Sequence, residues 1–349
     1  MSMDPYEESA AVRALSRYPY AVRSVRLLSD KGKKAVWYVD AEDAGGLILK
    51  KVPFGTEAIR FMIAAIDYMR GRGLGTPRVH RTSDGGGWAR EDGQNYVLFD
   101  AVRGRPPEYK IEAELRTLLR GLATFHVASQ GFESPTGFYP SYLLTDRETT
   151  MRRRVEQLAA WKSAAAGKPN PNGFDRLFLG RADAFVAQGE DALERLRRTG
   201  YGDWVRLTHE TKTLCHQDFA AGNTAIGDDG RFYVFDMDSL TVDVPIRDLR
   251  KILNKVMKRD LAWDLDTMLT MMKAYHEAHP LTKDQYAALV AELTFPHLVY
   301  GQVSKYYEGR EPSWTEEKHL QRLHEMILTE SSKERVLESF LAGLDAWVR

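Results

Sequence analysis

Residues 214–223 read LCHQDFAAGN, and an aspartate follows thirteen residues after the final asparagine, within residues 233–238, which read YVFDMD. This pattern predicts two short apolar strands on either side of a loop. The loop carries Asp218 and Asn223, and Asp236 closes the return strand. Because Gly222 permits a tight turn, we expect Asp218 and Asn223 to point to one place. Asp236 would reach it from the antiparallel strand.

These residue types suit phosphoryl transfer, which requires much positioning and charge neutralisation and little covalent chemistry from the protein. A carboxylate must lie near the acceptor hydroxyl, and Asp218 is the candidate. Asn223 and Asp236 offer an amide oxygen and a carboxylate, ligands that Mg²⁺ accepts while it keeps several waters. Each of these residues alone would more often be structural, since Asp and Asn stabilise turns. Together they favour a kinase-like site.

The run His216-Gln217-Asp218 with Asn223 resembles the catalytic loop of the aminoglycoside phosphotransferase and choline kinase group. Residues 235–238, FDMD, are similar to the metal-binding strand of that group. The group also places an aspartate at the start of the next helix to brace the catalytic loop, and residues 244–250, VPIRDLR, provide Asp248. The resemblance therefore implies ATP and Mg²⁺ as cofactors and His216 and Asp248 as supports of the loop.

A narrower resemblance is to the CotS-like spore coat proteins of endospore-forming bacilli. It covers residues 214–253, and the turn at residues 73–77 and the pair Gly104-Arg105 are also similar. The resemblance implies an α+β, two-lobed protein kinase-like fold. We expect a small β-rich nucleotide-binding lobe over residues 1–102 and a large helical lobe, with the catalytic loop and the acceptor site, over residues 103–349.

The expected small lobe begins with a helix over residues 8–17. Alternating apolar residues then predict a hairpin of residues 22–28 and 35–39, followed by a strand over residues 47–52. In kinase-like lobes a lysine of this third strand reaches the α- and β-phosphates, and Lys50 is our candidate. The alternative for Lys50 is a solvated charge at the end of a strand. The hairpin has no glycine-rich motif, as is usual in the aminoglycoside phosphotransferase group.

The expected helix over residues 56–69 carries Glu57, the candidate ion-pair partner of Lys50. Glu57 also lies early in the helix, where the helix dipole favours an acid in any case. Strands are expected over residues 79–82 and 95–99, and the segment after them is the natural linker between lobes. In the related kinases the backbone of this segment grips the adenine, which implies a nucleotide-binding role for Phe99 and Ala101.

The remainder of the chain is expected to be mostly helical. The helical patterns cover residues 112–126, 147–166, 174–198, 249–258, 261–279, 283–305 and 316–347.

Composition and local hydropathy argue against nucleic-acid binding, membrane spans and secretion. The chain has 349 residues, and 49 basic side chains balance 49 acidic ones, so no net charge favours nucleic acid. No run approaches the length of a membrane helix, and residues 1–10 show no secretory signal. The single cysteine, Cys215, is interpreted as a buried strand residue and suits a reducing compartment. We expect a cytoplasmic protein, or one assembled into the spore coat with other coat proteins.

Three functions remain open at this point. The first is transfer of the γ-phosphoryl group of Mg-ATP to a hydroxyl acceptor, small molecule or protein, for which Asp218, Asn223 and Asp236 argue. The second is an inactive structural component of the spore coat, which the resemblance to coat proteins favours. The third is a nucleotide-binding scaffold. The acceptor has no pattern that the sequence could reveal.

Overall fold

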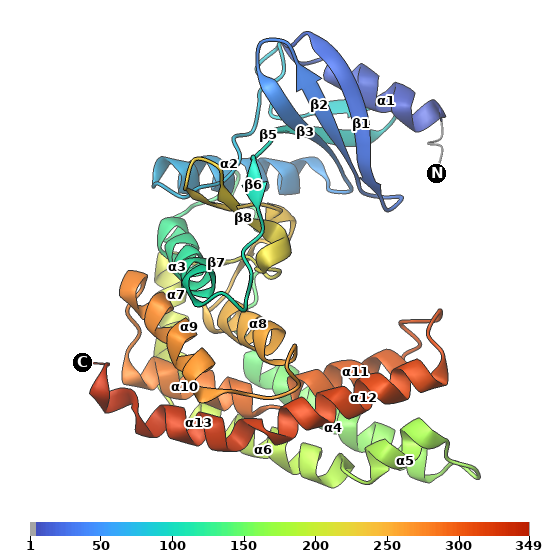
Figure 1. Cartoon of the computed structure of the whole chain (residues 1–349), viewed down its shortest axis with the longest axis vertical. Helices are drawn as coiled ribbons and strands as arrows, with labels where there is room; N and C mark the ends of the chain where they lie inside the picture. Colours follow the sequence, from blue (N-terminus) through green and yellow to red (C-terminus); the bar gives the residue numbers. More distant parts are fainter. Residues whose placement is uncertain (1–4, 349) are drawn as a thin grey trace. The chain divides into compact units, whose positions relative to one another are not determined.

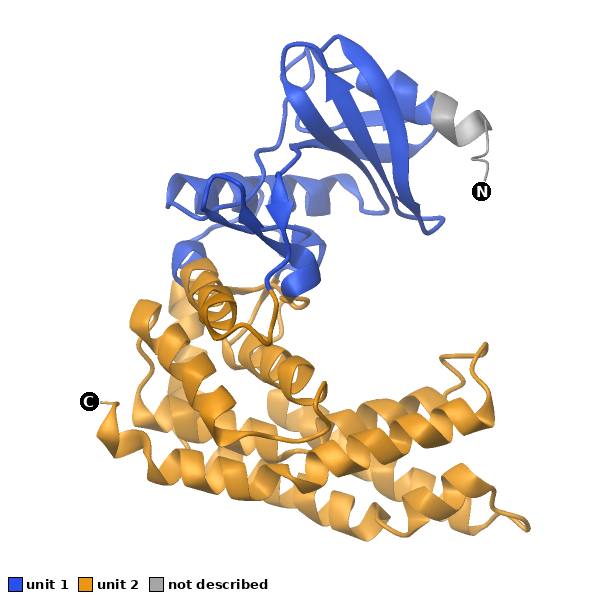
Figure 2. Ribbon diagram, in the orientation of Figure 1, with its two compact units in different colours: residues 1–107, 127–141, 221–240 blue, residues 108–126, 142–220, 241–349 orange. Residues whose placement is uncertain are grey.

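The computed structural model describes residues 5–348 of the chain (Figure 1). Compact packing divides the chain into two units (Figure 2). Unit 1 contains residues 1–107, 127–141 and 221–240, and unit 2 contains residues 108–126, 142–220 and 241–349. The units interleave along the sequence, so the lobe boundary at residues 102 and 103 stays a prediction. Residues 1–4, which belong to the N-terminal segment where no secretory signal is expected, lie outside the described residues.

Unit 1 is built on an antiparallel sheet of five described strands in the order β1-β2-β3-β5-β4. Its strands are β1 (Val22–Asp30), β2 (Ala35–Ala41), β3 (Gly45–Val52), β4 (Ala89–Glu91) and β5 (Gln94–Asp100). The predicted hairpin and third strand are thus confirmed. The predicted strand over residues 79–82 is wrong: Val79 forms an isolated bridge with Phe99, while β4 pairs with residues 94–96 of β5.

The sheet has two different faces because successive side chains of a strand point to opposite sides. On one face, Trp37, Leu49 and their neighbours form an apolar core with helix α1 (Pro5–Leu15). On the other face, Val36, Ile48 and Lys50 line a cavity. This alternation places Lys50, rather than its buried neighbour Lys51, among the lining residues.

Unit 1 also contains helix α2 (Thr56–Gly71) and a second small sheet. This sheet has the order β6-β8-β9, with β6 (Gly104–Arg105), β8 (Thr224–Gly227) and β9 (Phe232–Val234). Gly75 packs against β9: its carbonyl accepts a hydrogen bond from the Val234 amide at 2.8 Å, and an added Cβ would lie 2.1 Å from the Phe232 carbonyl oxygen. The turn at residues 73–77 therefore supports the strand that leads to Asp236.

Unit 2 is mostly helical, and it also contains the strand pair β7 (Leu214–Cys215) and β10 (Thr241–Val242). Its described helices are residues 112–126 of α3 (Glu112–Ser129), α4 (Arg147–Ala166), α5 (Gly173–Leu179), α6 (Ala182–Arg197), α7 (Tyr201–Thr211), α8 (Ile246–Met257), α9 (Leu265–Ala278), α10 (Lys283–Thr294), α11 (His297–Tyr307), α12 (Glu316–Ser331) and α13 (Lys333–Ala342). Within residues 5–348, no helix combines the length and apolar character needed to cross a membrane.

Three long helices predicted from the sequence are each two helices. The pattern over residues 174–198 divides at Gly180 into α5 and α6, and the pattern over residues 283–305 divides at Pro296 into α10 and α11. Proline ends a helix because it has no amide hydrogen and its ring clashes with the preceding turn. The third pattern, over residues 316–347, divides at Ser332, and helix α7 was not predicted at all.

Candidate functional site

A cavity of about 680 Å³ lies within unit 1. Its apolar wall comes from β2, β3, α2 and β5 and includes Tyr38, Ile48, Met62 and Phe99. The volume is within the usual range for small-molecule sites, which combine apolar walls with a few convergent polar groups. The cavity can therefore hold a molecule as large as a nucleotide.

Charged side chains converge on the same cavity. Among the described lining residues, the cations are Lys31, Lys34, Lys50 and Arg103, and the carboxylates are Asp100, Asp236 and Asp238. Mixed charges of this kind suit a polyanion bound together with a cation, because the lysines can contact the anion while the carboxylates hold the cation.

Lys50 forms ion pairs with both Asp236 and Asp238, and the distance from its Nζ to Asp238 Oδ1 is 2.6 Å. Lys34 Nζ lies 2.8 Å from Asp238 Oδ2. The Asp238 side chain is only 4% exposed, whereas the Asp236 side chain is 40% exposed. Partial burial lowers the pKa of Lys34, but the hydrogen bond and charge of Asp238 outweigh that effect and raise the pKa overall. Sequence reasoning assigned no role to Lys34, and it preferred Asp236 over Asp238 as the metal ligand.

Alternation along a continuous strand predicts that Asp236 and Asp238 lie on the same face, but neither residue lies on a strand. Strand β9 ends at Val234, Asp236 has left-handed backbone angles (φ 64°, ψ 54°), and Asp238 lies in a short 3₁₀ turn. Left-handed geometry is uncommon outside glycine, although aspartate tolerates it better than most residues. Both carboxylates nevertheless reach Lys50, from the turn rather than from a strand.

Asn223 lines the same cavity and ends a 3₁₀ turn over residues 221–223. Its carbonyl oxygen accepts a hydrogen bond from the Phe235 amide at 3.0 Å, so the asparagine is tied to the residue before Asp236. An amide and two carboxylates in one cavity are the hard oxygen ligands that Mg²⁺ prefers. The donor set of Asn223, Asp236 and Asp238 therefore fits a magnesium ion.

The proposed nucleotide-binding residues Phe99 and Ala101 both line the cavity. The Ala101 amide donates a hydrogen bond to the Gly46 carbonyl at 3.1 Å, so that amide already has a partner within unit 1. The expected ion pair between Glu57 and Lys50 is absent among the described residues. Its carboxylate lies 3.4 Å from Arg60, one helical turn away, and Lys50 pairs with the aspartates instead. Glu57 is not among the described lining residues of the cavity.

In unit 2, strand β7 leads directly into the predicted catalytic loop. His216 is fully buried, and its amide donates to Asp248 Oδ2 at 2.6 Å, while the Gln217 amide donates to Asp248 Oδ1 at 2.9 Å. Asp248 lies in the first turn of α8. Burial would raise the pKa of Asp248, but its interactions with His126, followed by those with His216, outweigh burial and lower it. Asp248 thus contacts the loop backbone at two consecutive residues.

Two lysines of α8 also contact the loop, and sequence reasoning missed both. Lys251 Nζ donates to the carbonyl and side-chain oxygens of Gln217 at 2.5 and 2.8 Å. Gln217 itself has a left-handed backbone, with φ 73°. Burial, followed by the charge of Arg250, lowers the pKa of Lys251 to about 8. Lys255 Nζ lies 3.4 Å from Asp218 Oδ1, and the Asp218 side chain is 66% exposed. Asp218 is therefore the accessible carboxylate of this loop.

Three buried groups behind the loop, His126, Cys215 and Asp248, lie close enough to share a metal ion. Their hydrogen bonds indicate a structural role instead. His126 contacts Tyr275 and Asp248 through its two ring nitrogens, at 2.7 and 3.3 Å, and Asp248 also accepts from the loop. Burial raises the pKa of the Cys215 thiol, which disfavours the thiolate that a metal requires. The prediction that Cys215 is a buried strand residue is confirmed.

Comparison with known proteins identifies relatives along nearly the whole chain. The family model described as spore coat putative kinase YutH matches residues 35–340. Spore coat protein S of Bacillus subtilis (strain 168) is 32% identical over 339 residues, which cover 97% of this chain and 95% of that protein.

Solved structures share the fold. An aminoglycoside phosphotransferase from Alicyclobacillus acidocaldarius matches with a TM-score of 0.81 at 18% identity, covering 100% of this chain and 97% of that one. A spectinomycin phosphotransferase crystallised with ADP and spectinomycin matches with a TM-score of 0.60 at 11% identity, covering 97% and 98%. An amicoumacin kinase in complex with AMP-PNP and Ca²⁺ matches with a TM-score of 0.59 at 14% identity, covering 95% and 93%. The expected aminoglycoside phosphotransferase-like fold is thus confirmed.

Proposed function

The chain belongs to the spore coat putative kinase YutH family, and from this we propose that it binds Mg-ATP and transfers the γ-phosphoryl group to a hydroxyl acceptor. We further propose residues 1–102 as the nucleotide-binding lobe and residues 103–349 as the lobe that carries the catalytic loop and the acceptor site. Because its relative is spore coat protein S, we propose that the protein is assembled into the spore coat.

The observation that carries this proposal is the convergence of Lys50, Asn223 and Asp236 on one cavity of nucleotide size. Lys50 would contact the phosphates, and the aromatic ring of Phe99 would lie against the base. Asn223, Asp236 and Asp238 would hold Mg²⁺, which neutralises charge on the phosphates when bound. The lysine contacts of the two aspartates would be exchanged for the metal and the phosphates.

Asp218 is the proposed catalytic residue. It is exposed, and the loop that carries it is held from behind by hydrogen bonds to Asp248 and Lys251. Its carboxylate would orient the acceptor hydroxyl and accept its proton. His216, whose Nδ1 lies 3.3 Å from the Asp218 amide nitrogen, would keep the loop in shape.

Nucleotide binding is tested first by thermal unfolding with ATP and Mg²⁺. A ligand at about 100 times its dissociation constant stabilises the folded state by about 2.7 kcal/mol. We expect a clear increase in melting temperature that needs both ATP and Mg²⁺. An unchanged melting temperature at millimolar ATP would exclude nucleotide binding.

The metal assignment is tested by comparing Asp236→Ala with Asp238→Ala. We expect Asp236→Ala to remove the magnesium dependence of ATP binding more completely, because Asp236 is the more exposed carboxylate and corresponds to the metal ligand of the related kinases. ATP affinity is measured by titration calorimetry at several Mg²⁺ concentrations. Equal losses in the two variants would contradict the larger role of Asp236 and would mean that Asp238 contributes as much to the metal site.

The catalytic assignment is tested with Asp218→Asn. We expect the fold and the ATP affinity to persist, while phosphoryl transfer falls by roughly 10² to 10⁴ as a general-base contribution is lost. Wild type and variant are incubated with labelled ATP, Mg²⁺, hydroxyl metabolites and cell-extract proteins. Equal transfer rates for wild type and variant would show that Asp218 is not a catalytic residue.

The competing function is a structural coat protein without catalysis. It predicts no transfer by wild type or variant to any acceptor, together with normal assembly of the Asp218→Asn protein into the coat. A nucleotide-binding scaffold would bind Mg-ATP but show no transfer. The binding and transfer measurements thus separate the three functions.

A further inference from the structure

Helix α8 presents a row of lysines that begins at the catalytic loop. Lys251, Lys255 and Lys258 are spaced by four and three residues, which places them on one face of the helix. Lys251 contacts Gln217, and Lys255 contacts Asp218. Lys258 follows at the end of the helix. The row therefore leads away from the carboxylate that we propose as catalytic.

Lys258 differs from the other cations of this region. The residue is exposed, and within the described residues 5–348 its ammonium group has no ion pair or hydrogen bond. The protein atoms around it and the charges of Lys255, Lys305 and Arg322 lower its pKa. Repulsion among these cations is relieved when an anion binds beside them.

The more distant cations of the cluster already have partners. Lys305 Nζ lies 3.0 Å from Glu311 Oε1, and Arg322 lies 2.8 Å from Glu325. Favourable interaction with the C-terminal end of α8 accounts for a cation in the last turn, but it does not account for a second cation, Lys258, that follows Lys255 on the same face. Lys255 also pairs with Asp218, so within the described residues 5–348 Lys258 is the cation of this group that has no ion pair or hydrogen bond.

We propose that Lys255 and Lys258 bind an anionic group, a phosphate or a carboxylate, on the acceptor whose hydroxyl is placed at Asp218. This inference rests on the proposed phosphotransferase function and specifies its substrate class. Lys258 lies three residues beyond Lys255, about 4.5 Å along the helix axis. The anionic group is thus only a few bonds from the reacting hydroxyl, as in a small hydroxyl compound. An acidic polypeptide fits less well, because the outer cations Lys305 and Arg322 are already paired.

The lysines take no part in bond making. The acceptor oxygen forms a bond to the γ-phosphorus, the bond from the γ-phosphorus to the β,γ-bridging oxygen breaks, ADP leaves, and the hydroxyl proton passes to Asp218. An anion bound at Lys255 would weaken the contact of that lysine with Asp218, the group that must accept the proton. The lysine pair would thus select the acceptor and position it.

Binding is tested with inorganic phosphate, titrated into the full-length wild-type protein and two variants and followed by calorimetry. Lys258→Ala removes the proposed ligand group, and Lys273→Ala removes an equivalent exposed charge on α9. A hydrogen bond to a charged group corresponds to roughly a tenfold change in affinity or more. We expect that loss in Lys258→Ala alone. Absence of phosphate binding by wild type, or equal effects of the two substitutions, would overturn the proposal.

Selectivity is tested with matched acceptors: glycerol and glycerol 3-phosphate, ribose and ribose 5-phosphate, and serine peptides with neutral or acidic flanks. We expect kcat/KM at least about tenfold higher for the phosphorylated member of a small-molecule pair. Lys258→Ala should remove this preference and leave KM for ATP unchanged. A preference for neutral compounds or for acidic peptides would overturn the inference while the kinase function stands. If no acceptor is phosphorylated but phosphate binding still depends on Lys258, the proposed kinase function is wrong and the anion site stands.

Discussion

At the scale of single residues, the ion pairs of Asp238 hold together the charged side of the cavity in unit 1. Its carboxylate is almost fully buried and lies between the ammonium groups of Lys34 and Lys50, at 2.8 and 2.6 Å. Asp236 pairs with Lys50 as well and is much more exposed. Breaking a buried ion pair costs more than breaking an exposed one, because it leaves an uncompensated charge without water. The two aspartates should therefore differ in their effect on folding.

We predict that Asp238→Asn lowers the free energy of unfolding by roughly 2 kcal/mol or more, and that Asp236→Asn lowers it by less than about 1 kcal/mol. Urea unfolding without nucleotide measures both. The double variant Lys34→Met with Asp238→Asn serves as a control, since removing both partners of the pair should recover part of the loss. A larger loss of unfolding free energy for Asp236→Asn than for Asp238→Asn would contradict the conclusion that Asp238 is the more buried carboxylate.

The lowered pKa of Lys251 makes the free energy of unfolding depend on pH. Its pKa is about 8 in the folded protein and about 10.4 in an unfolded chain, so the unfolded chain binds more protons between these values. Stability therefore rises with pH over this interval. Below about pH 8 both states are protonated, and the full cost of the buried charge is present.

We predict that wild type gains stability relative to Lys251→Met as pH rises from about 8 to about 10, by up to about 3 kcal/mol. Urea unfolding of both proteins at several pH values measures the difference. Lys273→Met is the matched control, and it should show no such trend relative to wild type. A constant difference between wild type and Lys251→Met would mean that Lys251 keeps an ordinary pKa.

At the scale of elements, close backbone packing holds the turn at residues 73–77 against β9. The Gly75 position has no room for a side chain, because the Phe232 carbonyl oxygen lies 2.1 Å from where a Cβ would be. Since β9 leads to Asp236 two residues after its end, movement of β9 would displace the proposed metal ligand. The turn thus has a structural reason to contain glycine.

We predict that Gly75→Ala destabilises the protein by roughly 1 to 3 kcal/mol, the usual cost of overpacking, and weakens Mg-ATP binding. Gly71→Ala is the control, because that position at the end of α2 has open space. It should leave binding unchanged and stabilise the protein by about 0.4 to 1 kcal/mol. Unfolding curves and ATP titration test both. Equal behaviour of the two variants would show that the turn does not support β9.

At the scale of the large helical unit, a buried ionic cluster joins helices that are distant in sequence. Glu292 of α10 is fully buried and lies 3.1 Å from both Arg147 of α4 and Arg250 of α8, and 3.3 Å from His297. Burial, followed by the charge of Arg250, lowers the pKa of His297 to about 3. Glu292 thus compensates two buried guanidinium groups. Arg250 lies on the helix that supports the catalytic loop, and Arg147 also lies 3.8 Å from buried Asp243.

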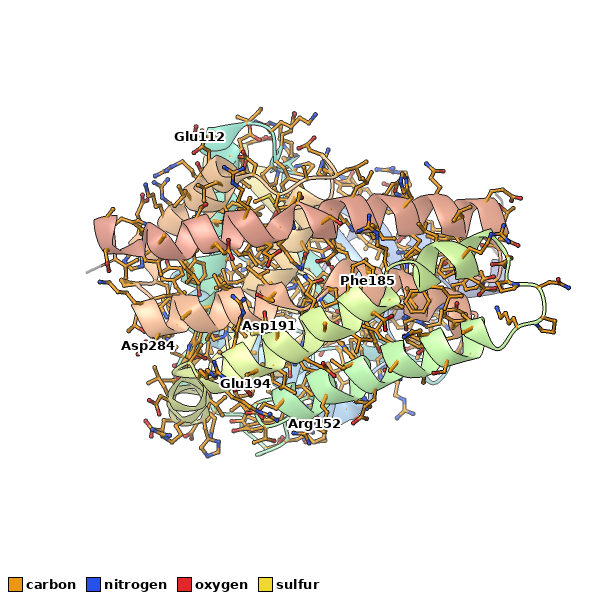
Figure 3. All side chains as sticks on the ribbon, turned by 90° about the horizontal axis from the view of Figure 1, so that it is seen from below. Glu112, Arg152, Phe185, Asp191, Glu194 and Asp284 are labelled. Carbon is orange, nitrogen blue, oxygen red and sulfur yellow. The ribbon has the colours of Figure 1, made fainter. Side chains whose placement is uncertain are left out.

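We predict that Glu292→Ala lowers the free energy of unfolding by about 3 to 5 kcal/mol, because buried Arg250 loses its counter-charge and buried Arg147 is left with Asp243. Glu194→Ala is the control. Glu194 lies on the outside of α6 (Figure 3) in an exposed pair with Arg198, so its loss should cost about 0.5 kcal/mol or less. Chemical unfolding measures both values. A loss below about 1 kcal/mol for Glu292→Ala would show that water reaches the cluster.

The sequence by itself determined the fold class, the family and the residues of the loop, because these depend on local patterns. Alternation in residues 35–52 predicted the strands, and the spacing from His216 to Asn223 identified the loop. Helix divisions at Gly180 and Ser332 could not be predicted, since helical periodicity continues across them. The tertiary structure alone decided that Lys50 pairs with Asp238, 188 residues away, rather than with Glu57. Ion pairs of this kind depend on backbone turns, such as the left-handed one at Asp236, and on how deeply each charge is buried. Both are properties of the packed chain, which local sequence patterns do not contain.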